Sequence, residues 1–192
     1  LPIYTKKPDM PYLSLGISPQ SYKMEEMYHH IVTIDSLYPG SIHKYASNYK
    51  YCSIQLYGNY NDSNIIRVKN AMRENNSALD NLTSFDFSNA TLNITNGLKG
   101  FFQGTTKLGQ VIFPQERNES PVNLDSTFYG SGIYEVNLSY FENITCMDFA
   151  FTSSSLKKVT FSEKENNNEV SFIQTFLGCP IDSIDLSSFS KI

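Results

Sequence analysis

The sequence predicts a repeat solenoid of the leucine-rich-repeat type, with parallel β-strands on one face and irregular loops and short helical or 3-10 turns on the other. One six-residue phrase, apolar at its first, fourth and sixth positions, occurs five times at spacings of 26, 25, 23 and 25 residues. A period in this range is typical of solenoids, because one unit cannot bury its apolar face without neighbours. The phrases begin at Leu82, Leu108, Ile133, Leu156 and Ile181.

A second feature repeats with the same period. A pair of apolar residues four positions apart follows each of the first four phrases. Residues i and i+4 lie on one face of a helical turn, so each unit is expected to contain a short helical or 3-10 segment. The pairs are Leu98/Phe102, Leu124/Phe128, Met147/Phe151 and Phe172/Phe176. A turn follows each pair and ends at Gly104, Gly130, Ser153 or Gly178, where glycine permits a positive φ.

Stacked in register, equivalent apolar residues would form continuous columns inside the molecule. One such column is Phe85, Val111, Val136, Val159 and Ile184. Burying each side chain would contribute about 1.5–3 kcal/mol. The alternative is a β-sandwich with five unrelated strands, in which apolar and polar residues also alternate. The solenoid is favoured because the Phe and Gly positions repeat together with the strands.

The chain divides into three parts. Residues 1–50 are predicted to be an N-terminal cap or incoming segment, with a short helix after Pro19 and a strand at 31–34. Residues 51–81 are predicted to be a degenerate, enlarged repeat, with a strand at 51–56 and a helix after Asp62. Residues 82–192 hold four full repeats and a truncated fifth. A solenoid needs its terminal apolar faces covered, so we expect either that the native chain continues past the truncated repeat or that another subunit covers the uncapped C-terminal end by self-association.

Three segments resemble a known family. They are Ile181-Asp-Ser-Ile-Asp-Leu-Ser-Ser-Phe189, Leu138-Ser-Tyr-Phe-Glu-Asn-Ile-Thr-Cys-Met-Asp-Phe-Ala-Phe151 and Phe176-Leu-Gly-Cys179. These resemble BspA-like leucine-rich repeats, in particular the repeat of about 25 residues in mycoplasma-type surface lipoproteins. The resemblance covers residues 82–192, although the Gly-Cys turn is complete only at Gly178-Cys179. It implies a noncatalytic cell-surface or secreted protein concerned with adhesion or with a surface coat or fibre.

Composition agrees with an extracellular or cell-surface location. Only 18% of the residues are charged, whereas about a quarter is usual. The net charge of −4 argues against nucleic acid as a partner, because a surface that binds phosphates is basic. No apolar run is long enough for a membrane span. The resemblance implies that the partners are proteins or glycans at a cell surface, and the composition agrees with this.

Asn-X-Ser/Thr triplets occur eight times, about twice as often as chance predicts. In a eukaryotic secretory protein they would be glycosylation sites, and Asn61, Asn75 and Asn81 have the most loop-like surroundings. The alternative is that some of these side chains cap turns of the repeat. The full set of candidates is Asn61, Asn75, Asn81, Asn89, Asn93 and Asn143.

The sequence contains no recognised catalytic, metal-binding or cofactor-binding motif. It has three histidines, no nucleophile elbow, no metalloprotease motif and no phosphate-binding glycine-rich loop. The three cysteines form at most one disulfide, and no Cys-X-X-Cys pair suggests a metal site. We therefore expect a protein that is not an enzyme and needs no cofactor.

The exposed side of the strand phrase is the predicted ligand-binding face. Alternate side chains of a strand point to solvent, so two rows of outward residues are expected. Glu135 and Lys158 would form an ion pair across neighbouring strands. A glycan on Asn137 would obstruct this face. The predicted face consists of Gln110, Ile112, Glu135, Asn137, Lys158 and Thr160. The alternative function is therefore that the protein is a receptor, which recognises a peptide or glycan through this face.

Overall fold

The structure is a computed structural model that describes residues 27–32 and 37–192. Most of the predicted helix after Pro19, and part of the predicted strand at 31–34, lie outside these residues. Where the predicted helix can be compared, it is wrong, because residues 27–32 form strand β1 (Met27–Val32). This strand pairs with β2 along its whole length, and that pairing prevails over a helix-like pattern that is only local.

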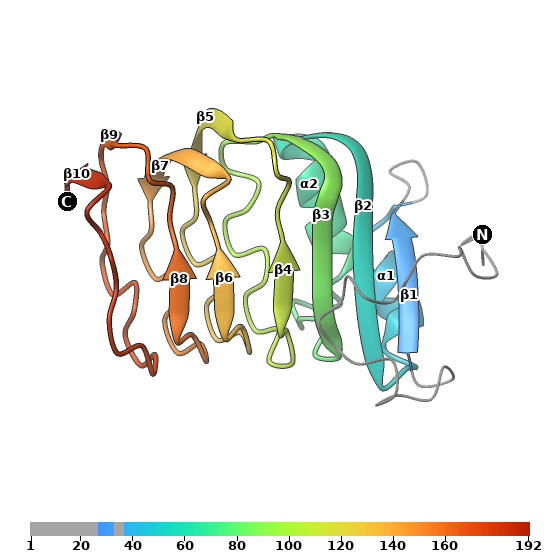
Figure 1. Ribbon diagram of the computed structural model, residues 1–192. Coiled ribbons are helices and arrows are strands. Elements are labelled where there is room, and N and C mark those ends of the chain that lie inside the picture. Colours follow the sequence, from blue (N-terminus) through green and yellow to red (C-terminus); the bar gives the residue numbers. More distant parts are fainter. Residues whose placement is uncertain (1–26, 33–36) are drawn as a thin grey trace.

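Two parallel sheets lie on the side that we call the front (Figure 1). The larger has the strand order β1-β2-β3-β4, where β2 is Tyr51–Asn61, β3 is Leu82–Asn93 and β4 is Gln110–Ile112. The smaller pairs β6 (Glu135–Asn137) with β8 (Lys158–Thr160). Two further parallel pairs lie at one edge: β5 (Asn118–Asn123) with β7 (Phe141–Cys146), and β9 (Asn166–Glu169) with β10 (Phe189–Lys191).

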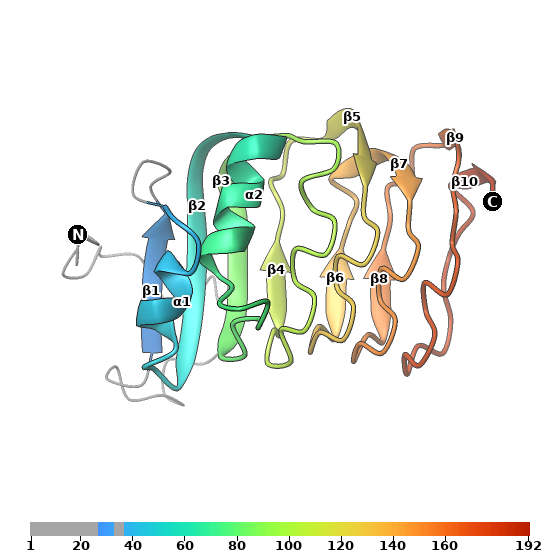
Figure 2. The same ribbon diagram turned by 180° about the vertical axis from the view of Figure 1, so that it is seen from behind.

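Both helices lie behind the larger front sheet (Figure 2). They are α1 (Ser41–Ala46) and α2 (Asp62–Ala71), and the helix predicted after Asp62 is confirmed. The side chain of Asn61 caps α2 by accepting a hydrogen bond of 2.9 Å from the backbone N–H of Asn64. Ile65 and Val68 on the inner face of α2 are buried, which fixes the helix against the sheet.

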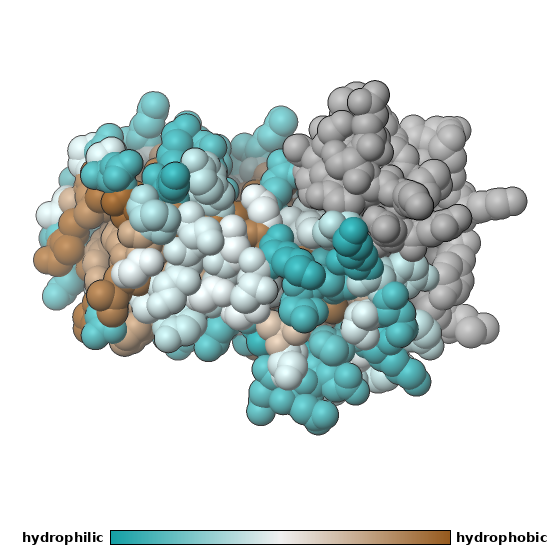
Figure 3. Space-filling model, turned by 90° about the horizontal axis from the view of Figure 1, so that it is seen from below, coloured by the Kyte–Doolittle hydropathy of each residue, from teal (hydrophilic) through white to brown (hydrophobic). Residues whose placement is uncertain are grey.

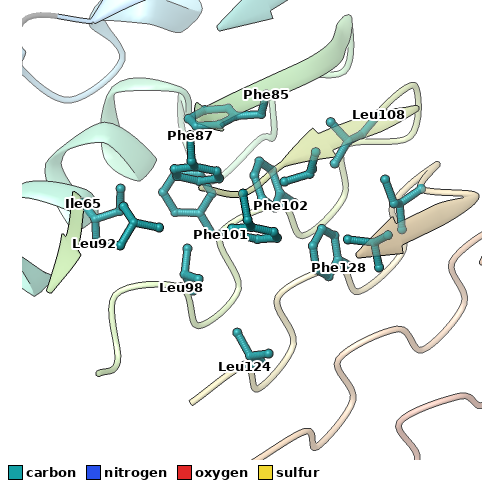
Figure 4. Close-up of a cluster of buried hydrophobic side chains, with 14 of the residues drawn as sticks. Ile65, Phe85, Phe87, Leu92, Leu98, Phe101, Phe102, Leu108, Leu124 and Phe128 are labelled. Atoms are coloured by element: carbon teal, nitrogen blue, oxygen red, sulfur yellow. The ribbon is translucent and has the colours of Figure 1, made fainter. Parts of the chain in front are cut away.

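The hydrophobic core lies between the front strands and the segments behind them (Figure 4). Phe85 and Phe87 point inward from β3 and meet Phe101 and Phe102 from the back of the molecule. The ring centroids of Phe85 and Phe102 are 5.2 Å apart, and those of Phe101 and Phe102 are 4.7 Å apart, both with edge-to-face geometry. Aromatic rings prefer such tilted contacts, and these four buried rings form a contiguous part of the core.

The predicted leucine-rich-repeat solenoid is wrong. That fold would carry one continuous sheet along its strand face and short helices on the return side. The described residues instead form four separate sheets, one with four strands and three with two, and none of their helices lies beyond Ala71. Val136 pairs with Val159, and Phe85 with Val111, but β4 and β6 are not paired. The fifth phrase, which begins at Ile181, forms no strand.

Left-handed residues explain why turns replace the predicted helical segments. In each of the four segments that carry an apolar pair, the residue two positions after the first apolar residue has a positive φ. The residue four positions further on also has a positive φ. An α-helix cannot contain such residues. The first set is Gly100, Ser126, Phe149 and Gln174, and the second is Gly104, Gly130, Ser153 and Gly178. The positive φ predicted for the glycines of the second set is therefore confirmed, with values between 62° and 77°.

Replacing Ser153 with Gly is expected to stabilise the protein. Ser153 has a φ of 57°, which strains a residue with a side chain. Because glycine relieves this strain but gains freedom in the unfolded chain, we expect a net increase of about 0.5–1 kcal/mol in the free energy of unfolding. Denaturant titration measures it. The matched control is Gly130→Ser, which places the same side chain in open space and should cost about the same amount. Equal stabilities for all three proteins would contradict the prediction.

Candidate functional site

Four tight turns lie side by side behind the smaller front sheet and the neighbouring strand (Figure 2). We call them the turn column, which consists of residues 98–104, 124–130, 147–153 and 172–178. Each turn closes by local backbone bonds, as in the first, where the N–H of Phe101 donates to Leu98 and that of Gln103 donates to Gly100. The turns expose alternate backbone groups at their sides, and these link one turn to the next.

Backbone hydrogen bonds between the turns all run in one direction. The N–H groups of Gly100, Phe102 and Gly104 donate to carbonyls of the second turn at 3.0, 2.8 and 2.8 Å. The second turn donates to the third in the same way, and the third donates to the fourth. The column therefore has a carbonyl end at residues 98–104 and an N–H end at residues 172–178.

A row of phenylalanine rings runs inside the column. Neighbouring rings of Phe102, Phe128, Phe151 and Phe176 have centroids 5.3, 5.2 and 5.8 Å apart and are stacked, with interplanar angles of 17°, 3° and 9°. The first three rings are buried, whereas Phe176 is only half-buried. The stack therefore continues to the N–H end, where its last ring is half-buried and is stacked on Phe151.

Two cationic side chains cap the carbonyl end. Lys69 Nζ donates to the carbonyl of Lys99 at 3.0 Å, and Arg73 Nη2 donates to Gln103 at 2.9 Å and to Phe101 at 3.5 Å. In the second, third and fourth turns, the carbonyls equivalent to those of Lys99, Phe101 and Gln103 accept hydrogen bonds from backbone N–H groups of the preceding turn. Lys69 lies in the last turn of α2, and Arg73 follows the C-cap residue Met72. Burial lowers the pKa of each, and for Lys69 the neighbouring charges of Arg73 and Lys99 lower it further.

The N–H end has no comparable cap. Within residues 37–192, no acceptor is present for the backbone N–H groups of Gln174, Phe176 and Gly178. Their counterparts in the third turn, Phe149, Phe151 and Ser153, donate to the fourth turn at 2.9, 3.0 and 2.7 Å. Gln174 and Gly178 are exposed, so their donors are open to solvent or to a partner.

The same end of the molecule exposes large apolar side chains. Ile173, Leu177 and Ile192 are 57%, 57% and 68% exposed, and the space-filling view shows hydrophobic residues gathered at this end (Figure 3). Phe172 and Phe176 are half-buried beside them. Exposed apolar residues that gather in one place mark interaction surfaces more often than single ones do. We call these five residues with the open donors the C-terminal face.

Four of the six residues of the predicted ligand-binding face are exposed on the smaller front sheet. Glu135 lies opposite Lys158, and Asn137 lies opposite Thr160. The predicted ion pair is confirmed, since Lys158 Nζ lies 2.8 Å from Glu135 Oε1, and this hydrogen bond raises the pKa of Lys158. The two charges neutralise each other, so the patch offers a ligand little net field.

The rest of the predicted face belongs to the larger front sheet. Gln110 and Ile112 are half-buried on β4, which pairs with β3 and not with β6. Ser84 and Asp86 stand at the outward positions of the first phrase, where the alternation of the strand predicts exposure. That prediction is wrong, because both are buried within the four-stranded sheet. A carboxylate oxygen of Asp86 accepts a hydrogen bond of 3.1 Å from Gln55 Nε2, which replaces contacts with water.

The glycosylation candidates differ in accessibility. Asn81 is 4% exposed, and its Nδ2 donates to the carbonyls of Ala46 and Tyr49 at 2.7 Å each, so this prediction is wrong for the folded protein. Asn143 is half-buried, and its Nδ2 donates to the carbonyl of Glu119. The remaining candidates are exposed: Asn61, Asn75, Asn89 and Asn93.

A polar groove of about 610 Å³ lies between the end of β3 and residues 114–119. Asn89 and Asn93 line it, so a glycan on either residue would occupy the groove. Beside it, the buried Glu142 pairs with Lys164 at 2.5 Å and with Arg117 at 3.4 Å. The hydrogen bond from Lys164 is the main reason that the pKa of Glu142 is lowered. This carboxylate is fully paired and therefore serves to hold the neighbouring segments together.

The chemistry of the described residues is otherwise sparse. Cys52, Cys146 and Cys179 are all free thiols, and burial raises the pKa of Cys52 and Cys146. Across residues 27–32 and 37–192, no three His, Cys, Asp or Glu residues lie together as metal ligands. None of the helices in this part of the chain has the length and apolarity needed to cross a bilayer.

Sequence reasoning predicted an uncapped C-terminal end, but it missed the cap at the carbonyl end of the turn column and the backbone donors at the N–H end. The one available signal for Lys69 and Arg73 was their spacing of four residues on a predicted helix. The open donors at Gln174, Phe176 and Gly178 belong to the backbone, so no residue type reveals them.

Comparison with known proteins gives no relative: no family model, curated protein or solved structure matches the chain.

Proposed function

We propose that this protein is a noncatalytic module of the cell surface or extracellular space that adheres to, or assembles with, other polypeptides through its C-terminal face. The observation that carries this proposal is the coincidence of exposed apolar residues and open backbone donors at residues 172–178. Apolar side chains supply the driving force of association, and unpaired donors select a partner that can accept them.

Composition and surface chemistry support the extracellular part of the proposal. Charged residues are few, and exposed Asn-X-Ser/Thr sites stand at Asn61, Asn75, Asn89 and Asn93. We favour the C-terminal face over the front patch around Glu135, because that patch is small and its charges are mutually paired. Adhesion or assembly through one end also leaves the polar groove and the glycan sites free.

Selection from a random-peptide library displayed on phage tests this function. We expect the protein to enrich peptides that bind it, and the double variant Ile173→Asp/Leu177→Asp to bind them at least tenfold more weakly. Both replacements put a charge where an apolar side chain would be buried, and each such burial contributes about 1.5–3 kcal/mol. Titration of the selected peptides against both proteins measures the difference.

The matched control is Tyr38→Asp/Ile66→Asp, because Tyr38 and Ile66 are exposed apolar residues away from this face. The control should bind the peptides as the unmodified protein does. Enrichment of no peptide, or equal weakening by both double variants, would contradict the proposed function.

A further inference from the structure

The second half of strand β3 pairs with a neighbouring strand on one side only. On that side, β3 pairs with β2 as far as Asn93. On the other side, it pairs with β4 only at residues 84–86, and β3 continues past the end of β4 (Figure 1). Pro114, two residues after β4, has no backbone N–H to donate to a ladder, and the pairing ends before it. Beyond this point, the polar groove separates β3 from residues 114–119.

Side chains satisfy the backbone at both ends of this edge but not in its middle. Asn118 Nδ2 donates to the carbonyl of Leu92 at 2.9 Å, and the N–H of Ser88 donates to Asp86 Oδ1 at 2.7 Å. Alternate residues of a strand direct their backbone groups to the same side, so the N–H and C=O of Ala90 face the groove as the carbonyl of Leu92 does. Within residues 27–32 and 37–192, neither group of Ala90 has a hydrogen-bond partner on this side.

The unpaired groups of Ala90 lie in a sheltered position. Ala90 lines the groove and is only 6% exposed, whereas Asn89 and Thr91 on either side of it are exposed. A sheltered backbone N–H and C=O cost free energy unless water or a ligand pairs with both. An occupant must therefore offer one acceptor and one donor side by side, and the edge of an extended peptide does so.

The wall opposite β3 adds a charge to this requirement. Arg117 on that wall pairs with Glu142 at 3.4 Å, and Glu119 pairs with Lys164 at 3.4 Å. Glu116 lines the groove and is exposed, and none of the described residues forms an ion pair with it. A cationic side chain in the groove would complement this carboxylate.

We propose that residues 88–92 of β3 are a docking edge for an extended peptide segment of a partner polypeptide. The segment lies beside β3 in the polar groove as an added strand, pairs with the N–H and C=O of Ala90, and places a Lys or Arg side chain against Glu116. The site shares no residue with the C-terminal face, so this proposal goes beyond the proposed function.

Amide hydrogen exchange measured by NMR tests whether the edge is open. The protein is made without N-linked glycans, because a glycan on Asn89 or Asn93 would occupy the groove. After correction for intrinsic rates, the amide of Ala90 should exchange at least tenfold faster than that of Thr91, which faces β2 in the same strand. Equal slow exchange of these two amides would mean that Ala90 already has an acceptor, and would overturn the proposal.

Selection from a random-peptide library displayed on phage tests binding. The bait is the variant Ile173→Asp/Leu177→Asp, which disables the C-terminal face, so a failure here is distinguishable from a failure of the proposed function. We expect enrichment of peptides that contain Lys or Arg. A saturating selected peptide should slow exchange at Ala90 at least tenfold and leave Thr91 unchanged. The same peptide with methylated backbone nitrogens cannot donate to Ala90 and should bind at least tenfold more weakly.

Charge reversal tests the role of Glu116. Glu116→Lys should weaken binding of the selected peptides at least fivefold, because it replaces attraction with repulsion. The matched control is Asp80→Lys, an equal change of charge at an exposed residue two positions before β3 begins, and it should alter binding less than twofold.

Four results of these binding experiments would overturn the proposal. They are enrichment of no peptide, unchanged exchange at Ala90 with a bound peptide, equal binding of the methylated peptide, and equal weakening by the two charge reversals. Protection of Ala90 by an oligosaccharide, with no peptide enriched, would identify the groove as a glycan site and would also overturn it.

Discussion

Replacing Phe128 with Ala is expected to lower the free energy of unfolding by about 3–5 kcal/mol. The ring is 1% exposed and lies between Phe102 and Phe151, at centroid distances of 5.3 and 5.2 Å. Its removal loses the burial of one large side chain and two stacking contacts. It also leaves a cavity, because the flanking turns are held by backbone hydrogen bonds and cannot close the gap. Denaturant unfolding followed by circular dichroism measures the loss.

The matched control for Phe128 is Phe176→Ala at the N-H end of the same stack. Phe176 is half-buried and has one stacked neighbour, so its loss should be less than half as large. Equal losses at the two positions would mean that the stack does not depend on burial, and would contradict our description of the turn column.

Replacing Gly132 with Ala is expected to cost about 3 kcal/mol of stability. An added Cβ would lie 2.2 Å from the carbonyl oxygen of Thr106 and 3.1 Å from that of Leu108. Both obstacles are backbone atoms, so relief requires the chain to move. The N–H of Gly132 donates to the carbonyl of Thr105 at 3.0 Å, and this bond would be strained by the movement.

Gly109→Ala is the control for Gly132→Ala. A Cβ at Gly109 would approach the carbonyl oxygen of Thr83 no closer than 3.7 Å, which is an ordinary contact. This variant should therefore be within about 0.5 kcal/mol of the parent or slightly more stable, since Ala reduces the freedom of the unfolded chain. Comparable destabilisation by the two variants would show that the close approach at Gly132 is not the cause.

Local rules predicted several elements correctly. The helix after Asp62 was predicted from the spacing of Ile65 and Val68, which needs no information from distant residues. The positive φ of Gly104, Gly130 and Gly178 was predicted because glycine is the residue that tolerates it at little cost. The Glu135–Lys158 pair followed from equivalent positions in two copies of one phrase.

Other predictions failed because local patterns are shared by competing structures. An apolar pair four residues apart suits a helical turn, but Leu124 and Phe128 lie in the same tight turn, in which Ser126 between them is in the left-handed region. Asp86 has the outward position of its phrase and is nevertheless buried, because its neighbours in the sheet replace solvent. Asn81 carries the acceptor triplet, yet two carbonyls from another segment hold its amide.

The sequence by itself determined which residues recur, and therefore that like side chains, such as Phe128 and Phe151, would occupy equivalent places. Only the tertiary structure decided that the strands divide into separate sheets and that Lys69 and Arg73 satisfy the carbonyls at one end of the turn column. The physical reason is that composition and periodicity constrain side chains, whereas the pairing of backbone N–H and C=O groups depends on which segments meet in space.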